Sequence, residues 1–358
     1  MKFKIDTHKI DLLKKENQDD YFYINSNTLK KYKNGKLISF YDDSDKYNFL
    51  IFEIIEIIDV EYNNINESNI LYNDHKSHCW FRLKLKRHYF ELSMVDNFVF
   101  DMDGTLLNDK KLILDENIKS LNELKSMGKN IIVATGRPLF TLNHIDEVPT
   151  DFPIICANGA LIYNKDRSLL KSFKIDKNEC RKIYQYLKEH DMEFLMYTPD
   201  YVLGCKNNSC KYIELRNYVS TIGKNYMDGD FLNELDKYDI CKFLIHMPCT
   251  TEEKLKNLKE YLKQFNVYLV RSQSTFADIM RKDATKGEAV KFLANKYNLD
   301  LNRTICFGDA ENDTSMFSIS KYSASPASGN INAKSKSLLR ARNHKVPWLS
   351  EFIEQFKK

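Results

Sequence analysis

Long uninterrupted apolar runs are missing from this sequence of 358 residues. Its opening stretch, MKFKIDTHKIDLLKKENQDD, contains no such run, so we expect no signal peptide. The most apolar segment, NFLIFEIIEIIDV, is interrupted by Glu53, Glu56 and Asp59, which argues against a membrane-spanning segment.

A strong excess of one charge is missing as well. The 54 Lys and Arg residues nearly balance the 50 Asp and Glu residues, which leaves a net charge of +4. That imbalance is too small to favour nucleic acid or an anionic membrane as a partner. The hydrophobic share of 43% is ordinary for a soluble globular protein, and the length is sufficient for two or three domains.

Paired cysteine motifs are also absent, because the eight cysteines are scattered without a C-x-x-C pair. Cys156 and Cys306 lie inside apolar, strand-like runs, where cysteine behaves as a small hydrophobic residue. We therefore expect a reduced, cytoplasmic environment. A disulfide between Cys205 and Cys210 is the alternative that the pattern favours less.

Glycine is scarce, and this makes its positions informative. Five of the 11 glycines occur in five short segments that carry polar residues. They are Gly104, Gly136, Gly159, Gly287 and Gly308. Glycine at such places allows a backbone to approach a ligand closely.

The segment from residue 95 onwards alternates apolar strands with helices. NFVF, NIIVATGR, FPIICANGA and RTICFGD read as buried strands, and DENIKSLNELKSMG reads as a helix with Asp115 as N-cap and Gly128 as its end. This alternation predicts an α/β fold whose mostly parallel sheet is covered on both faces. We assign residues 95–159 and 282–358 to this core.

Two further blocks are predicted around the core. Residues 160–281 have strand and helix signals of their own and read as an inserted α+β domain. Residues 1–94 read as a folded, partly β extension, in which the alternating FRLKLKR at 81–87 predicts a strand and NFLIFEIIEII favours one. No chemistry can be assigned to this extension.

Polar residues follow four predicted strands of the core. Ligands of open α/β sheets bind outside the carboxyl ends of the strands, so these residues should lie together. They are Asp101 and Asp103, then Thr135, Gly136 and Arg137, then Asn158, and finally Asp309, Asn312 and Asp313. Carboxylates that lie close together repel unless a cation lies between them, so this edge predicts a site for a hard cation and an oxyanion.

The segment DATKGEAVKF adds a lysine to this site. Thr285 and Glu288 have the spacing of a capping box, which places Lys286 at the first helical position. A lysine there is unfavourable for the helix dipole by itself, but it is reasonable beside a bound phosphate. Each of these motifs alone could be a surface turn, a helix cap or a solvated lysine, but all four together favour a functional site.

Taken in order, DMDGT, ATGR, the lysine at a helix start and GDAEND resemble the four motifs of the haloacid dehalogenase (HAD) superfamily. The NGA after the third strand and the long insert resemble its Cof-type subfamily, with a C2B-type α/β cap on a Rossmann-like core. The resemblance covers roughly residues 95–345.

The resemblance implies a Mg²⁺-dependent phosphatase of small phosphorylated metabolites, with sugar phosphates as the leading class. Asp101 corresponds to the nucleophile that forms an aspartyl-phosphate, and Asp103 corresponds to the general acid and base. The implied metal ligands are Asp101, the Asp103 backbone carbonyl and Asp309, with Asp313 as an auxiliary ligand. The implied phosphate-binding positions are Met102, Thr135, Gly136, Lys286 and Asn312, and Asn158 and Arg137 are candidates for substrate contact.

Two alternatives stay open at this stage. A phosphosugar mutase would use the same aspartyl-phosphate, and a non-catalytic metabolite-binding regulator could use the same scaffold. The loop after the fourth motif departs from the family pattern, and either Asn330 or Asn332 is the candidate counterpart there. The oligomeric state is not predicted.

Overall fold

The computed structural model describes residues 80–205, 213–271 and 275–357 and, before these, residues 2–4, 13, 21–26, 29–30, 32–41, 50–61, 65, 70–74, 77 and 79. Cys210 lies outside these residues, so the alternative of a Cys205–Cys210 disulfide lies outside them too. Cys156 and Cys306 are buried and free, as expected for small hydrophobic residues. No helix within the described ranges is long and apolar enough to cross a membrane.

The core is a parallel sheet of five strands in the order β20-β19-β18-β7-β8. These strands are β7 (Asn97–Phe100), β8 (Asn130–Val133), β18 (Thr304–Phe307), β19 (Tyr322–Pro326) and β20 (Leu339–Ala341). The two central strands, β7 and β18, are buried along their whole length, which explains their uninterrupted apolar sequences. The predicted α/β core is therefore confirmed.

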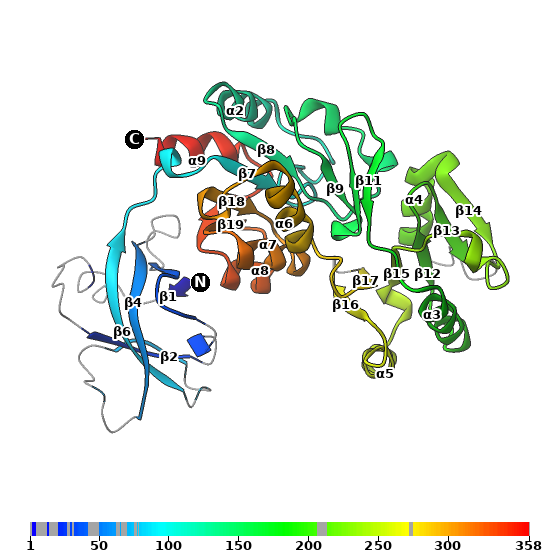
Figure 1. Cartoon of the computed structure of the whole chain (residues 1–358), viewed down its shortest axis with the longest axis horizontal. Coiled ribbons are helices and arrows are strands. Elements are labelled where there is room, and N and C mark those ends of the chain that lie inside the picture. The colour runs from blue at the N-terminus through cyan, green and yellow to red at the C-terminus, as the bar shows by residue number, and fades with distance from the viewer. Residues whose placement is uncertain are drawn as a thin grey trace.

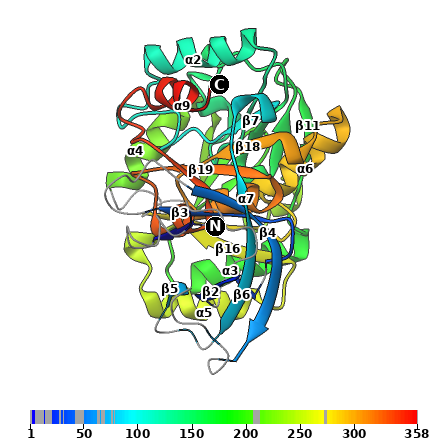
Figure 2. The same ribbon diagram turned by 90° about the vertical axis from the view of Figure 1, so that its left-hand side faces the viewer.

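Helices cover both faces of this sheet. Figure 1 shows α2 (Asp115–Ser126) and α9 (Trp348–Phe356) on one face, and they lie together again in Figure 2. On the other face lie α6 (Lys286–Tyr297), α7 (Thr314–Ile319) and α8 (Ile331–Lys336). Because aromatic side chains fill this core, Phe100 stacks on Phe307 at 4.9 Å between ring centroids, and Trp348 packs against both.

The beginning of α2 differs from the prediction by one residue. Leu114, and not Asp115, occupies the N-cap position, and its side chain makes no capping hydrogen bond. Asp115 and Glu116 lie in the first turn, where their carboxylates face the positive end of the helix dipole. Gly128 follows the helix with a φ of 75°, as predicted for its end.

The third predicted core strand is short. β9 (Ile154–Cys156) joins the edge of the core through a single parallel bridge between Ala134 and Ile155. It pairs in antiparallel fashion with β10 (Leu161–Tyr163), which in turn pairs with β11 (Leu169–Ser172). The first hairpin after residue 160 thus remains attached to the core strand β9.

The remaining residues up to 281 form a separate six-stranded sheet in the order β14-β13-β12-β15-β17-β16. Its strands are β12 (Phe194–Tyr197), β13 (Val202–Cys205), β14 (Tyr226–Gly229), β15 (Lys242–His246), β16 (Val267–Arg271) and β17 (Phe276–Arg281). The helices of this unit are α3 (Lys177–Glu189), α4 (Ile213–Ile222) and α5 (Glu252–Leu262). An apolar cluster of its own, which includes Tyr184, Phe194 and Phe243, holds this α+β unit together.

The described N-terminal residues form another six-stranded sheet, in the order β1-β3-β4-β6-β2-β5. The strands are β1 (Lys2–Lys4), β2 (Tyr21–Asn25), β3 (Leu37–Tyr41), β4 (Leu50–Val60), β5 (Ile70–Asn73) and β6 (Trp80–His88). Both sequence segments that favoured strands are confirmed, as β4 and β6. Figure 1 shows this sheet and the inserted unit at opposite ends of the molecule, with the core between them.

The N-terminal sheet is attached to the core through polar and aromatic contacts. His88 lies 3.1 Å from the Tyr322 hydroxyl, and the Ser39 hydroxyl donates to the Leu338 carbonyl. Phe90, just after β6, packs against Tyr322 and Phe356. These contacts lie on the β19–β20 side of the core sheet, away from the inserted unit.

Candidate active site

The site is centred on Asp101, the first residue after β7. Its backbone N–H donates to the Phe307 carbonyl at 3.0 Å, which extends the pairing of β7 with β18 by one residue. Since β18 runs parallel to β7, its own end brings Asp309 to the same edge of the sheet. Asp101 is only 4% exposed, so its carboxylate is held largely away from water.

Three carboxylates gather at this edge. Each of the three contributes one carboxylate oxygen to a group in which all oxygens lie within 4.8 Å of one another. The three residues are Asp101, Asp309 and Asp313. Two glycines make room for them, because a Cβ on Gly104 would lie 2.5 Å from an Asp309 oxygen, and a Cβ on Gly308 would lie 2.4 Å from Asp313. The scarce glycines of the first and fourth motifs are therefore required by close approach to carboxylates.

The three carboxylates of this cluster carry more negative charge than one neighbouring cation balances. Burial raises the pKa of Asp101 to about 7, against the lowering effect of Lys286. Burial also raises the pKa of Asp309 well above its ordinary value, and the charges of Asp101 and Asp313 add to this. Oxygen ligands of high charge density are those that Mg²⁺ prefers, so the residues present fit a magnesium site.

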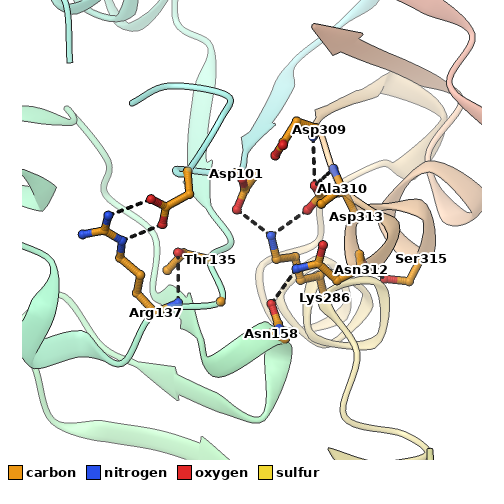
Figure 3. Close-up of polar contacts among 12 residues, drawn as sticks. Asp101, Thr135, Arg137, Asn158, Lys286, Asp309, Ala310, Asn312, Asp313 and Ser315 are labelled. Carbon is orange, nitrogen blue, oxygen red and sulfur yellow. Dashed lines mark hydrogen bonds and ion pairs between the residues drawn. The ribbon is translucent and has the colours of Figure 1, made fainter. Parts of the chain in front are cut away.

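Lys286 supplies a positive charge within this cluster. It begins α6, where the Thr285 hydroxyl accepts a hydrogen bond from the Glu288 N–H at 3.0 Å, as predicted. The Glu288 carboxylate instead pairs with Lys291 at 2.6 Å. Figure 3 shows the Lys286 amino group between Asp101 and Asp313, 2.6 Å from an oxygen of each.

Lys286 is 1% exposed, so its charge depends on these partners. Burial alone would lower its pKa, but Asp101 and Asp313 raise the pKa above its ordinary value. The second oxygen of Asp313 accepts hydrogen bonds from the backbone N–H groups of Asp309 and Ala310. Asp313 therefore holds Lys286 and the GDAEND loop together, in addition to being close to the other carboxylates.

The side chain of Asp103 is placed differently from the other acids. Arg137 binds its carboxylate through two hydrogen bonds of 2.5 and 2.7 Å, and Lys111 adds a third of 2.8 Å. Although burial alone would raise the pKa of Asp103, Arg137 and Lys111 lower it to about 2. From the sequence, Arg137 was a candidate for substrate contact. Its ion pair with Asp103, which joins residues 34 positions apart, was not predicted.

Thr135 and Gly136 follow β8 at the same edge of the sheet. Thr135 is fully buried, and its hydroxyl oxygen accepts the Arg137 N–H at 3.2 Å. Gly136 lies against Asn158, since a Cβ there would be 2.8 Å from the Asn158 side-chain oxygen. That oxygen accepts a hydrogen bond of 2.8 Å from the Asn312 amide, so the ends of three segments meet here (Figure 3).

Two site residues from the inserted unit were missed in the sequence. Lys242 and Asp278 are 2% and 0% exposed, and they contact Gly136 and Asn158 of the core. The signal available was a charged residue among the apolar residues of each of two strands, Lys242 in KFLIH and Asp278 in FADIMR, whose last residue Arg281 is also charged. A charge in such a place is rarely buried without a partner.

The loop after the fourth motif has two asparagines that could face the site. The backbone N–H of Asn330 donates to the Asp309 carbonyl at 2.8 Å, and its side chain caps α8 through the Ala333 N–H. Asn332 is exposed on the first turn of α8. Asn330 is therefore the one of the two that adjoins the acidic cluster.

Comparisons with known proteins show which sequences and folds this chain is similar to. The sequence model of the haloacid dehalogenase-like hydrolases matches residues 98–344. The protein of Mycoplasma genitalium named "Putative phosphatase MG265" is 32% identical over 250 residues, which cover 66% of this chain and 89% of that protein. The 5-amino-6-(5-phospho-D-ribitylamino)uracil phosphatase YwtE of Bacillus subtilis is 25% identical over 71% of this chain and 96% of its own length.

Solved structures share the fold. TM0651 from Thermotoga maritima superimposes with a TM-score of 0.60 and 26% identity, over 74% of this chain and 98% of that one. The subclass IIB sugar phosphatase BT4131 superimposes with a TM-score of 0.64 and 19% identity, over 73% of this chain and 99% of its own. At that identity the second likeness concerns the fold alone.

Proposed function

Because this chain belongs to the haloacid dehalogenase-like hydrolases, we propose that it releases phosphate from small phosphorylated metabolites with Asp101 as nucleophile and Mg²⁺ as cofactor. The chain is an enzyme of this family, a hydrolase of phosphate esters. The observation that carries the finer proposal is the group of Asp101, Asp309 and Asp313 at the carboxyl ends of adjacent parallel strands, with the buried Lys286 between Asp101 and Asp313.

Asp101 would begin the reaction. An oxygen of its carboxylate attacks phosphorus, the bond from phosphorus to the leaving oxygen breaks, and an aspartyl-phosphate forms. Water then attacks this phosphorus, and Asp101 leaves as a carboxylate. Mg²⁺, held by Asp101, Asp309 and the Asp103 backbone carbonyl with Asp313 in support, would neutralise the carboxylates and the phosphate so that they can approach one another.

Asp103 would transfer the protons. It gives one to the leaving oxygen in the first step and takes one from water in the second. In the structure Arg137 and Lys111 hold it as a carboxylate, which is the form that accepts a proton. To donate a proton, the Asp103 carboxyl group has to separate from Arg137. The guanidinium group is then free for another partner, and we assign it a contact with the part of the substrate outside the phosphate group.

The phosphate oxygens would lie among donors at the same edge of the sheet. Lys286 uses two of its three N–H donors on Asp101 and Asp313 and has one left for phosphate. Asn312 likewise keeps one amide hydrogen beyond the one given to Asn158. The Thr135 hydroxyl and the backbone N–H groups of Met102 and Gly136 complete the proposed set, which acts by positioning and charge stabilisation.

Metal removal tests this proposal directly. Release of inorganic phosphate from a generic aryl phosphate should stop in excess EDTA and return with excess Mg²⁺. Ca²⁺ should restore it poorly, because its looser coordination would misplace the attacking oxygen. Undiminished release in EDTA would contradict the metal assignment, and no release under any condition would favour a non-catalytic binding protein.

The inserted unit should restrict the enzyme to small substrates. Its Lys242 and Asp278 touch Gly136 and Asn158 directly, so the unit lies immediately over the proposed phosphate site. A lid in that position excludes water and admits sugar or nucleotide monophosphates, but it excludes a folded phosphoprotein. Initial rates on an aryl phosphate, a sugar phosphate panel and a phosphorylated folded protein, at equal phosphate concentration, measure this. Equal or faster release from the phosphoprotein would contradict the lid assignment.

A further inference from the structure

The sheet of the inserted unit has one face turned inward on its own helices and one turned toward the core. Phe243 and Ile279 belong to the apolar cluster of the inserted unit. Their neighbours Leu244 and Met280 belong to the apolar cluster of the core. Side chains alternate between the two faces of a strand. A residue two positions from Leu244 or Met280 on the same strand therefore points toward the core as well.

Lys242 and Asp278 lie on this core-facing side. β15 and β17 are antiparallel neighbours in which Lys242 pairs with Met280 and Leu244 pairs with Asp278. The two charged residues are therefore diagonal neighbours on one face, and the Lys242 amino group lies 3.2 Å from an Asp278 oxygen. The amino group also lies 4.2 Å from the centre of the Tyr197 ring.

Each member of this pair continues into the proposed phosphate site. The Lys242 amino group donates to the Gly136 carbonyl at 3.2 Å. The second oxygen of Asp278 accepts a hydrogen bond of 2.6 Å from the Asn158 amide, whose own oxygen accepts from Asn312. A continuous set of polar contacts thus links two strands of the inserted unit to the second and fourth motifs of the core.

Apolar contacts could attach the inserted unit to the core without these charges. Both members of a buried ion pair lose their hydration, which costs free energy. Apolar residues of similar volume in the same place often stabilise a protein as much as the ion pair does, or more. Leu244 and Met280, beside the pair, already supply apolar contact with the core. Directional hydrogen bonds, in contrast to apolar contacts, hold their acceptors at particular positions.

We propose that Lys242 and Asp278 are positioning residues, which align the Gly136 loop and the Asn158–Asn312 pair for phosphate only when the inserted unit is seated on the core. This inference rests on the proposed phosphatase function and adds a role for the inserted unit within it. Seating of the inserted unit on the core and alignment of the phosphate loop become one event, because the same two side chains take part in both.

The variants Lys242→Met, Asp278→Asn and the double variant separate positioning from mere attachment. Lys242→Met leaves Asp278 as a buried charge without its cation, so its Tm should fall by several degrees. The double variant is neutral, and the amide oxygen that replaces the Asp278 carboxylate still accepts from Asn158, so its Tm should recover. Its kcat should stay at least about tenfold below that of the wild type and its KM should rise, because Gly136 has lost its donor and the site holds phosphate less well.

Lys174→Met is the matched control. Lys174 belongs to the same inserted unit and also lies 3.2 Å from a carboxylate oxygen, that of Asp239, but both side chains are about half exposed. This control should keep the Tm and the kcat of the wild type. Recovery of both Tm and kcat in the double variant would show that the pair only attaches the inserted unit, and the proposal would be wrong.

A binding measurement keeps this inference separate from the proposed function. Inorganic phosphate with Mg²⁺ should raise the Tm of the wild type and of Lys174→Met, because a ligand stabilises the state that binds it. The increase should be lost in Lys242→Met and in the double variant. A wild type with this increase but without turnover would contradict the phosphatase and leave the positioning role supported, whereas equal increases in all variants, or none in the wild type, would contradict the positioning role.

Discussion

Replacing Asp101 with asparagine is expected to abolish phosphate release while the protein stays folded. Loss of an essential nucleophile typically lowers kcat by roughly 10⁵–10⁶-fold. Asparagine has nearly the same shape, and its oxygen can still accept the Lys286 hydrogen bond that Asp101 accepts at 2.6 Å. The substitution also removes one of three carboxylates that repel one another, so the Tm should change little.

Phosphate release and a thermal unfolding curve measure the two parts of this prediction. Asp115→Asn is a suitable control, because Asp115 is an exposed residue in the first turn of α2 and takes no part in the site. It should keep full activity. If the Asp101→Asn variant were folded and turned over at a rate near that of the wild type, the covalent mechanism would be wrong.

Replacing Lys286 with methionine should cause the second largest loss, in stability as well as in activity. The lysine is the cation that bridges Asp101 and Asp313, and all three side chains are buried. Removal of one partner from a buried ion pair costs about 3–5 kcal/mol. Phosphate would also lose a charged donor, so activity should fall by roughly 10³-fold.

The stability loss of this variant should depend on pH and on metal. Burial raises the pKa values of Asp101 and Asp309 and Lys286 lowers them, so removal of the lysine should raise both further. These two carboxyl groups then hold protons that the unfolded chain releases. The folded state of this variant therefore binds more protons than the unfolded chain does. Its free energy of unfolding falls as pH rises through this range. The Tm should therefore be lower at about pH 8 than at about pH 5, and Mg²⁺ should raise it more than in the wild type.

Lys291→Met serves as the control for the lysine. Lys291 is on the same helix and also lies 2.6 Å from a carboxylate oxygen, that of Glu288, but both side chains are more than two-fifths exposed. Its loss should cost at most about 1 kcal/mol and leave turnover unchanged. Equal effects of the two substitutions, or a Lys286→Met Tm that does not respond to pH, would show that Lys286 does not hold the acidic cluster.

Short-range patterns in this chain were reliable guides to its elements. The apolar runs before Asp101 and Asp309 are strands, and Thr285 caps the helix that begins with Lys286. The helix with Asp115 begins one residue away from the prediction, which is within the one or two residues by which helix ends vary. Such features depend on a few consecutive residues, so they can be read without the rest of the fold.

Long-range charge pairing could not be read in this way. Arg137 pairs with Asp103, 34 residues away, and Lys286 pairs with Asp101, 185 residues away. The neutral amide of Asn158 donates a hydrogen bond to the Asp278 carboxylate across 120 residues and across two structural units. In each instance several other charged residues were available as partners on the basis of sequence alone.

By itself, the amino-acid sequence determined the α/β core and the edge of the sheet at which Asp101, Thr135, Lys286 and Asp309 meet, because parallel strands have their carboxyl ends at one edge. Only the tertiary structure decided which charges touch, and it brought Lys242 and Asp278 of the inserted unit into the site. The physical reason is that an electrostatic contact depends on distance and burial, and both are set by how distant segments pack.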